Sequence, residues 1–186
     1  MGYTTDFSGQ FSVDPPLDQS QIDYLTQFAT TRHMARYEAL TEFLPDPARL
    51  SVGLPVGFEG SYYVGAEEND GSVIDYNHAP GEERNRFSNT NPIIPANHLG
   101  QPGLWCQWVP TDDGAFIEWD GGEKFYDSTE WIRYIVDHFL SPWGRTLSGA
   151  VDWQGEDSDD RGTIYAVDGV IHAVNDVITK PGPPTN

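Results

Sequence analysis

Hydrophobic and polar positions are most regular in the last third of the chain. Apolar residues and glycine take every second position over 147–153, while 163–167 and 170–174 are rich in strand-forming apolar residues. A period of two is typical of a strand with one buried face. Asp168 and Gly169 stand between the last two stretches, and Asp-Gly is a strong signal for a two-residue hairpin turn. We therefore predict a strand followed by a C-terminal hairpin.

Three shorter apolar stretches precede that strand. They lie at 104–109, 115–119 and 123–126, separated by turn-forming sequences rich in Asp and Gly. Short strands joined by such turns are typical of an antiparallel meander. We predict three meander strands in this region.

Two capping-box patterns predict where helices begin. Asp18 is followed by Gln21, and Asp127 by Glu130, each before apolar residues at helical spacing. The second helix is expected to end at Ser141-Pro142. The first continues past Arg32 in weaker form, either as one long helix or as a broken one, until Pro45 and Pro47 stop it.

The rest of the first half is less regular. Apolar residues of one parity from Tyr3 to Val13 predict a strand before the first helix, and the stretches 61–64 and 72–76 predict a hairpin. Residues 78–101 support no period and are expected to form a long irregular segment. The Pro- and Gly-rich residues 180–186 are expected to form a flexible tail.

These elements predict an α+β fold. A mainly antiparallel sheet, made of the meander and the C-terminal hairpin, would pack against one helix, with a second helix from the N-terminal half. The 186 residues suit a single domain over 1–186. All six tryptophans lie in the second half of the chain, which places the expected core there.

Charge narrows the range of partners. Ten Lys and Arg stand against 29 Asp and Glu, a formal net charge of −19. Phosphate backbones and anionic lipids repel such a chain, so direct nucleic-acid or membrane-surface binding is disfavoured and a basic protein partner is favoured. A hydrophobic content of 38% excludes a disordered acidic tail. With no signal-peptide pattern at the N-terminus and a lone Cys106, we expect a soluble cytoplasmic protein.

Several stretches of the second half carry a resemblance to known proteins. They are Gly-Leu-Trp-Cys-Gln-Trp at 103–108, the run 117–126, the run 138–144 and the run 151–157 with the closing hairpin. In these the chain resembles small acidic proteins of unknown function encoded by bacteria and their phages, with a fainter likeness over 13–17. Because no activity is associated with that family, the resemblance implies a bacterial or phage setting and no catalytic residue.

The sharpest motif for a metal lies at 157–168. Calcium loops place oxygen ligands at positions one, three, five and twelve with glycine at six, and Asp157, Asp159, Gly162 and Asp168 fit four of these positions. Arg161 occupies the fifth, where its charge opposes a cation. Calcium is the only cofactor that the sequence suggests, and the competing interpretation is a solvated acidic hairpin connection.

Paired carboxylates are the one candidate for catalysis. Glu118, Asp120 and Glu123 crowd a single turn, and carboxylates in different environments can act as acid and base. The alternative is turn chemistry at Asp120 with a cross-strand ion pair between Glu118 and Lys124. Cys106 is expected to be a buried apolar group.

The five histidines form no zinc pattern. They lack the helical i, i+4 pairing and the cysteine partners that zinc sites favour. Of these, His138 on the second helix is expected to be a locally hydrogen-bonded residue at the edge of the core.

The preferred function is a non-enzymatic acidic interaction protein of bacterial or phage origin, such as a phage accessory or inhibitor protein. Its partner is a basic protein, and the expected contacts are Glu156, Asp157, Asp159, Asp160, Trp105 and Trp143. The alternatives are a carboxylate- or metal-dependent hydrolase, a virion or assembly component, and a small-ligand binder that uses exposed tryptophans. A homo-oligomer stays open.

Overall fold

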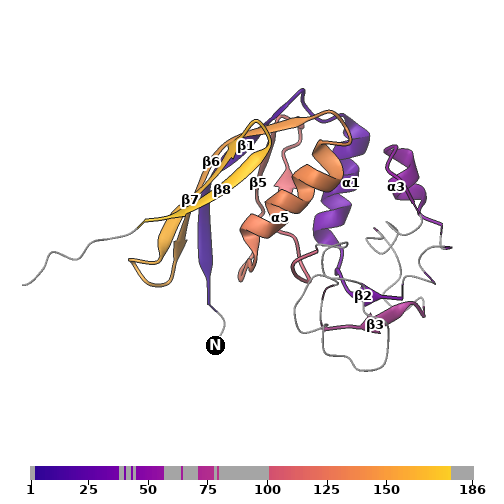
Figure 1. Cartoon of the computed structure of the whole chain (residues 1–186), viewed down its shortest axis with the longest axis horizontal. Helices are drawn as coiled ribbons and strands as arrows, with labels where there is room; N and C mark the ends of the chain where they lie inside the picture. The colour runs from indigo at the N-terminus through magenta and orange to yellow at the C-terminus, as the bar shows by residue number, and fades with distance from the viewer. Residues whose placement is uncertain are drawn as a thin grey trace, which may run out of the picture.

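A six-stranded antiparallel sheet forms the body of the molecule (Figure 1). The computed structural model describes residues 3–37, 40, 43, 45–56, 64, 71–77, 79 and 101–176. The strand order is β4-β5-β1-β6-β7-β8. The bounds are β1 Thr5–Asp14, β4 Trp108–Pro110, β5 Phe116–Trp119, β6 Thr146–Gly155, β7 Arg161–Val167 and β8 Val170–Asn175. A separate two-stranded sheet pairs β2 (Ala35–Arg36) with β3 (Val73–Asp75).

The N-terminal strand is the centre of the sheet. β1 lies between β5 and β6, and its long antiparallel pairing with β6 places Val13 opposite Leu147 and Phe7 opposite Trp153. On its other side Phe11 pairs with Ile117 of β5. β1 therefore joins the meander to the C-terminal hairpin in one sheet.

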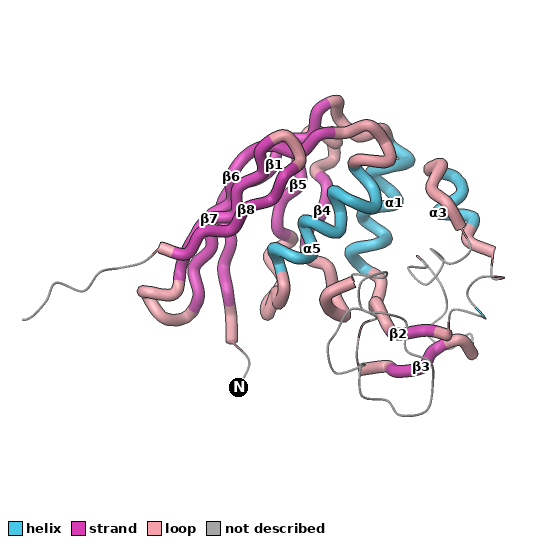
Figure 2. The backbone as a smooth tube through the Cα atoms, in the orientation of Figure 1, coloured by secondary structure: helices cyan, strands magenta, loops and turns pink. Residues whose placement is uncertain are grey.

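Helices cover one face of this sheet, which we call the inner face (Figure 2). They are α1 (Gln19–Thr30) and α5 (Ser128–Ile135), which continues into one π-helical turn, η3 (Val136–Leu140); the short α3 (Pro47–Ser51) packs beside α1. Fully buried rings from both layers meet between sheet and helices, among them Phe11, Phe28, Trp108, Trp131 and Phe139. The predicted α+β fold is confirmed. The core, however, draws on both halves of the chain and not only on the predicted second half, because Phe11 of β1 and Phe28 of α1 contribute to it.

Most of the strand predictions hold. The C-terminal hairpin has the expected two-residue turn, with Asp168 and Gly169 both at positive φ and Val167 opposite Val170. The 104–109 stretch, in contrast, is paired only from Trp108. Residues 123–126 form no strand, because Lys124 adopts a positive φ of 63° that ends an extended run. The meander therefore has two strands, and β1 takes the place of the third.

The first helix is shorter than its apolar spacing predicts. It begins at the Asp18–Gln21 capping box, as predicted, and ends at Thr30, where Thr31 turns to an extended conformation. Ala35 and Arg36 then pair with β3, so strand pairing replaces the expected helical extension. The partner expected for β3, at 61–63, lies outside the described residues, as do nearly all of 78–101 and the tail 180–186.

The second capping box is wrong in detail. Asp127 is the residue before α5, but its backbone is left-handed, with a φ of 54°, and its side chain makes no capping hydrogen bond. Burial raises the pKa of this carboxyl, and the Glu130 carboxylate raises it further. Packing of Trp131 and Ile132 against the core therefore holds the helix start.

Candidate interaction surface

The face of the sheet opposite the helices, which we call the outer face, is exposed. It is polar across β1, whereas β7 and β8 place the exposed apolar side chains of Tyr165, Val167, Val170 and Val174 on it. Residues directly opposite one another in register share a face, so Ser8, Asp152 and Thr163 form one row across β1, β6 and β7. The Thr163 hydroxyl donates to Asp152 Oδ1 at 2.6 Å, which confirms the row. A second row contains Asp6 and Gln154. No apolar layer covers these rows in the described part of the chain.

Carboxylates gather at one end of this sheet, which we call the acidic end. The start of β1, the β6–β7 loop (156–160) and the last residues of β8 meet there, because the strands are antiparallel and in register (Figure 1). Its carboxylates are Asp6, Asp152, Glu156, Asp157, Asp159, Asp160 and Asp176. Arg161 is the one cation among the described residues of this end, and its Nε lies 3.5 Å from Asp176 Oδ2. The acidic end is therefore strongly negative.

One side chain organises the β6–β7 loop. Gln154 Nε2 lies within hydrogen-bonding distance of the carbonyl oxygens of Gly155, Asp157 and Asp160, at 3.0, 2.8 and 3.3 Å. Backbone bonds from Gly155 N to Asp160 O and from Asp160 N to Asp157 O close the turn. The loop therefore holds its carboxylates in a defined arrangement.

The N-terminal segment is tied to the same loop. Tyr3 Oη donates to an Asp160 carboxylate oxygen, and Thr4 N donates to Glu156 Oε1 at 2.9 Å. The hydrogen bond to Asp160 raises the pKa of the Tyr3 hydroxyl. A Cβ added at Gly155 would meet Tyr3 Oη and Asp160 Oδ2, so the Tyr3–Asp160 pair lies directly over this glycine. Residues far apart in sequence thus fix the acidic end together.

A hollow of about 330 Å³ lies within this surface. Its lining includes the carboxylates of Asp6, Asp152 and Asp176 and the guanidinium of Arg161. Thr163 holds Asp152 in place, and Arg161 faces Asp176. Because acids outnumber the base, the hollow suits a cationic side chain better than an anion.

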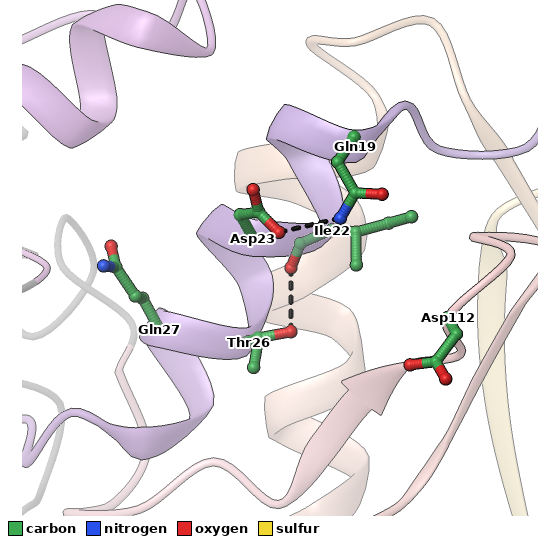
Figure 3. A pocket seen from close by; sticks show the side chains of 6 residues that line it. All are labelled: Gln19, Ile22, Asp23, Thr26, Gln27 and Asp112. Atoms are coloured by element: carbon green, nitrogen blue, oxygen red, sulfur yellow. Dashed lines mark hydrogen bonds between the residues drawn. The ribbon is translucent and has the colours of Figure 1, made fainter.

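A second hollow, of about 620 Å³, lies between α1 and the β4–β5 turn (Figure 3). Gln19, Asp23, Thr26 and Gln27 line it from the helix, and Asp112 faces them from the turn. Gln19 Nε2 donates to Asp23 Oδ1 at 2.8 Å, and Thr26 Oγ1 donates to the Ile22 carbonyl at 2.8 Å. Its lining contains no histidine, cysteine or serine, and Asp23 and Thr26 are engaged in these hydrogen bonds within α1.

The predicted catalytic carboxylates occupy three different surroundings. Glu118 lies in β5 opposite Val109, and the expected cross-strand pairing with Lys124 is wrong because 123–126 is not a strand. Asp120 Oδ1 accepts the Gly122 N–H at 2.7 Å, which closes the turn. Glu123 is exposed in the loop that follows.

The predicted calcium loop is divided by a strand. Asp157 and Asp159 lie in the β6–β7 loop, whereas Asp168 lies in the hairpin turn at the opposite end of β7. Seven extended residues span roughly 20 Å, too far for one ion to bridge. Within the described ranges, no three His, Cys, Asp or Glu side chains are grouped to hold a metal ion.

Two residues of commonly catalytic types, His33 and Cys106, are buried in the core. His33 is packed against Phe28 and Trp131, and burial lowers its pKa to about 3. Cys106 is fully buried as predicted, and burial raises the pKa of its thiol far above the usual range. His138 stacks on Tyr134 with ring centroids 4.2 Å apart.

The two tryptophans predicted to contact a partner differ in exposure. Trp105 is 44% exposed, with the Arg32 guanidinium 5.8 Å from its ring centroid. Trp143 is packed against the core, stacks on Phe139 and donates from Nε1 to the Val52 carbonyl at 2.9 Å. Trp143 is therefore mainly a packing residue.

No helix among the residues with described structure combines the length and apolar character that a membrane span requires. Comparison of the chain with family models, with curated proteins and with solved structures finds no match.

Proposed function

We propose that this chain is a non-enzymatic interaction protein that binds a basic protein partner through the acidic end of its sheet. The observation that carries the proposal is the gathering of carboxylates from β1, the β6–β7 loop and β8 at one end, against the single described cation Arg161. Arg161 is itself paired with Asp176, so one positive charge stands against seven carboxylates at this end. A field of this sign steers a basic protein to the surface.

The construction of the acidic end also supports binding. Gln154 and Tyr3 hold the β6–β7 loop from two sides, so its backbone geometry is set before a partner arrives. A preformed surface loses less conformational entropy on association than a flexible one. The outer-face hollow beside the loop offers a place for one lysine or arginine side chain.

The hydrolase alternative has less support. His33 and Cys106, two of the common catalytic residue types, are buried in the core. Asp120 is engaged in closing its own turn. Acid–base catalysis needs titratable groups that converge on one reacting position, and the described carboxylates near Asp120 do not provide this.

The experiment measures how the full chain binds a synthetic basic peptide, Lys-Val-Lys-Val-Lys-Val-Lys, by calorimetry at low and moderate salt. The test variant combines Glu156→Gln, Asp157→Asn and Asp159→Asn, all at exposed positions of the loop. We expect affinity to fall about tenfold in the variant, because each exposed charge contributes a fraction of a kcal/mol. Added salt should weaken binding of the natural chain.

The control variant changes net charge by the same amount elsewhere. It combines Asp23→Asn, Asp112→Asn and Asp137→Asn, which are exposed around α1 and η3. At moderate salt, affinity should then stay within about twofold of the natural chain, since these three carboxylates are outside the acidic end and salt screens distant charges. Equal losses in both variants, or no binding of the peptide at all, would refute the proposal.

A further inference from the structure

β8 is the edge strand of the sheet, next to β7 only. The backbone N–H and C=O groups on its free edge, the side away from β7, have no partner among the described residues. The Asp-Gly hairpin makes Val170 a hydrogen-bonded pair with Val167, and Asp176 N donates to Arg161 O at 2.9 Å, six residues later. In an antiparallel pair such residues alternate. The even-numbered residues of β8 therefore bond to β7, whereas Ile171, Ala173 and Asn175 direct their N–H and C=O groups away from the sheet.

This edge is accessible. All of β8 except Ile171 is exposed, including Ala173 and Asn175, which lie on the inner face beyond the cover of the helices. The side chains of Val170 and Val174 are 55% and 51% exposed. A strand added here would meet open backbone and apolar side chains on alternate positions.

The edge also lacks the usual protection against strand addition. Natural proteins block free edges with lysine, proline, bulges or very short strands. β4, at the opposite edge, is three residues long and ends in Pro110. β8 has six residues, Val-Ile-His-Ala-Val-Asn, with no Lys, Arg, Asp, Glu or proline, and its pairing with β7 is regular.

Charge decides what the occupant is. A second copy would bring another net charge of −19 against this one and set its own acidic end beside the sheet. A basic segment is attracted instead, because β8 runs directly into Asp176 and the acidic end. We propose that an extended lysine- or arginine-rich segment of the partner adds to β8 as a seventh strand. This inference rests on the proposed function and specifies how the partner binds.

The experiment follows backbone amide hydrogen exchange in the full chain by NMR, with and without the Lys-Val peptide. A second peptide, Lys-Lys-Pro-Pro-Pro-Lys-Lys, has the same length and charge but cannot extend a ladder, because its consecutive prolines remove N–H groups on both sides of the strand. We expect the Lys-Val peptide to slow exchange at Ile171, Ala173 and Asn175 by about tenfold or more. It should bind about tenfold more tightly than the Lys-Pro peptide.

A matched pair of variants tests the same edge. Ala173→Pro removes one outward N–H without removing a bond to β7, and Ala173→Val keeps that N–H. We expect Ala173→Pro to weaken the Lys-Val peptide about tenfold and Ala173→Val to leave it within about twofold. If Ala173→Pro fails to fold, the amide hydrogen exchange of the natural chain, with and without the Lys-Val peptide, tests the proposal by itself.

The possible results separate the two proposals. Equal affinity for both peptides, with the three outward amides unprotected, overturns strand addition while binding of a basic partner stands. Binding of neither peptide overturns both. Concentration-dependent protection of the three amides without peptide identifies a second copy as the occupant and overturns the inference.

Discussion

His33 donates from Nε2 to the backbone carbonyl of Phe28 at 3.0 Å, inside the layer between α1 and α5. A carbonyl only accepts, so this nitrogen carries the proton. Burial lowers the pKa of His33 to about 3 from 6.5. The unfolded chain therefore binds a proton between these values that the folded chain does not.

This linkage predicts a pH-dependent stability. The contribution of neutral His33 is complete above pH 6.5 and is lost as pH falls toward 3. Between pH 7.5 and 5 the natural chain should lose about 2 kcal/mol more unfolding free energy than His33→Gln, which keeps a donor but does not titrate. Urea unfolding at both pH values measures the difference. The carboxylates titrate in both proteins, so their contribution cancels in the comparison. Parallel curves of unfolding free energy against pH would therefore contradict the prediction.

The two predicted helix caps should respond differently to substitution. Asp18 Oδ1 accepts the Gln21 N–H at 3.0 Å, and Gln21 Oε1 accepts the Asp18 N–H at 3.2 Å. Asp18→Ala should therefore cost about 1 kcal/mol. Asp127 makes no cap bond, and Asp127→Asn, which tolerates the left-handed backbone, should stay within about 0.5 kcal/mol. Thermal unfolding of both variants tests this, and equal losses would refute it.

The Asp18 cap and the Asp168-Gly169 hairpin show how far local sequence predicts the fold. Asp168-Gly169 fixes the hairpin register, and that register alone places Arg161 opposite Asp176. Residues close in sequence encode both features, so a pattern reveals them. The strand predicted at 123–126 does not form because Lys124 adopts a positive φ. Lysine is not a residue type that favours this conformation, so the sequence carries no sign of it.

The acidic end could be predicted only in part. The carboxylates of the β6–β7 loop are contiguous in sequence, and we expected them at a partner surface. Asp6 and Asp152 join them through the pairing of β1 with β6, whose residues are more than a hundred positions apart. Such a pairing depends on the whole fold, so these two carboxylates have no local signal.

Two buried tryptophans provide a matched comparison of core energetics. Trp108 Nε1 donates to the Ser128 carbonyl at 2.8 Å, whereas Trp131 Nε1 has no acceptor among the described residues. Both side chains are almost fully buried, so replacement by Phe creates a similar cavity. Trp108→Phe also removes the indole hydrogen bond, whereas Trp131→Phe removes a buried donor that has no acceptor among the described residues. Trp108→Phe should cost about 1 kcal/mol more than Trp131→Phe in chemical unfolding, and the reverse order would contradict the hydrogen-bond assignment.

Gln154→Ala should disturb the acidic end more than the fold. The side chain is the common donor to Asp157 O and Asp160 O, so its removal frees the β6–β7 loop while leaving β6 paired with β1 and β7. We expect a loss of about 1 kcal/mol in unfolding free energy. The Asp160 amide, which donates to Asp157 O at 3.0 Å, should exchange at least about tenfold faster.

The matched control is Gln10→Ala, at an exposed position of β1 on the outer face. It removes an amide side chain of the same size but should leave the Asp160 amide unchanged. Because a mobile loop loses entropy when it binds, Gln154→Ala should also weaken the basic peptide by about threefold to tenfold with no change in net charge. Unchanged Asp160 exchange in Gln154→Ala would show that the backbone bonds of the turn hold the loop without this side chain.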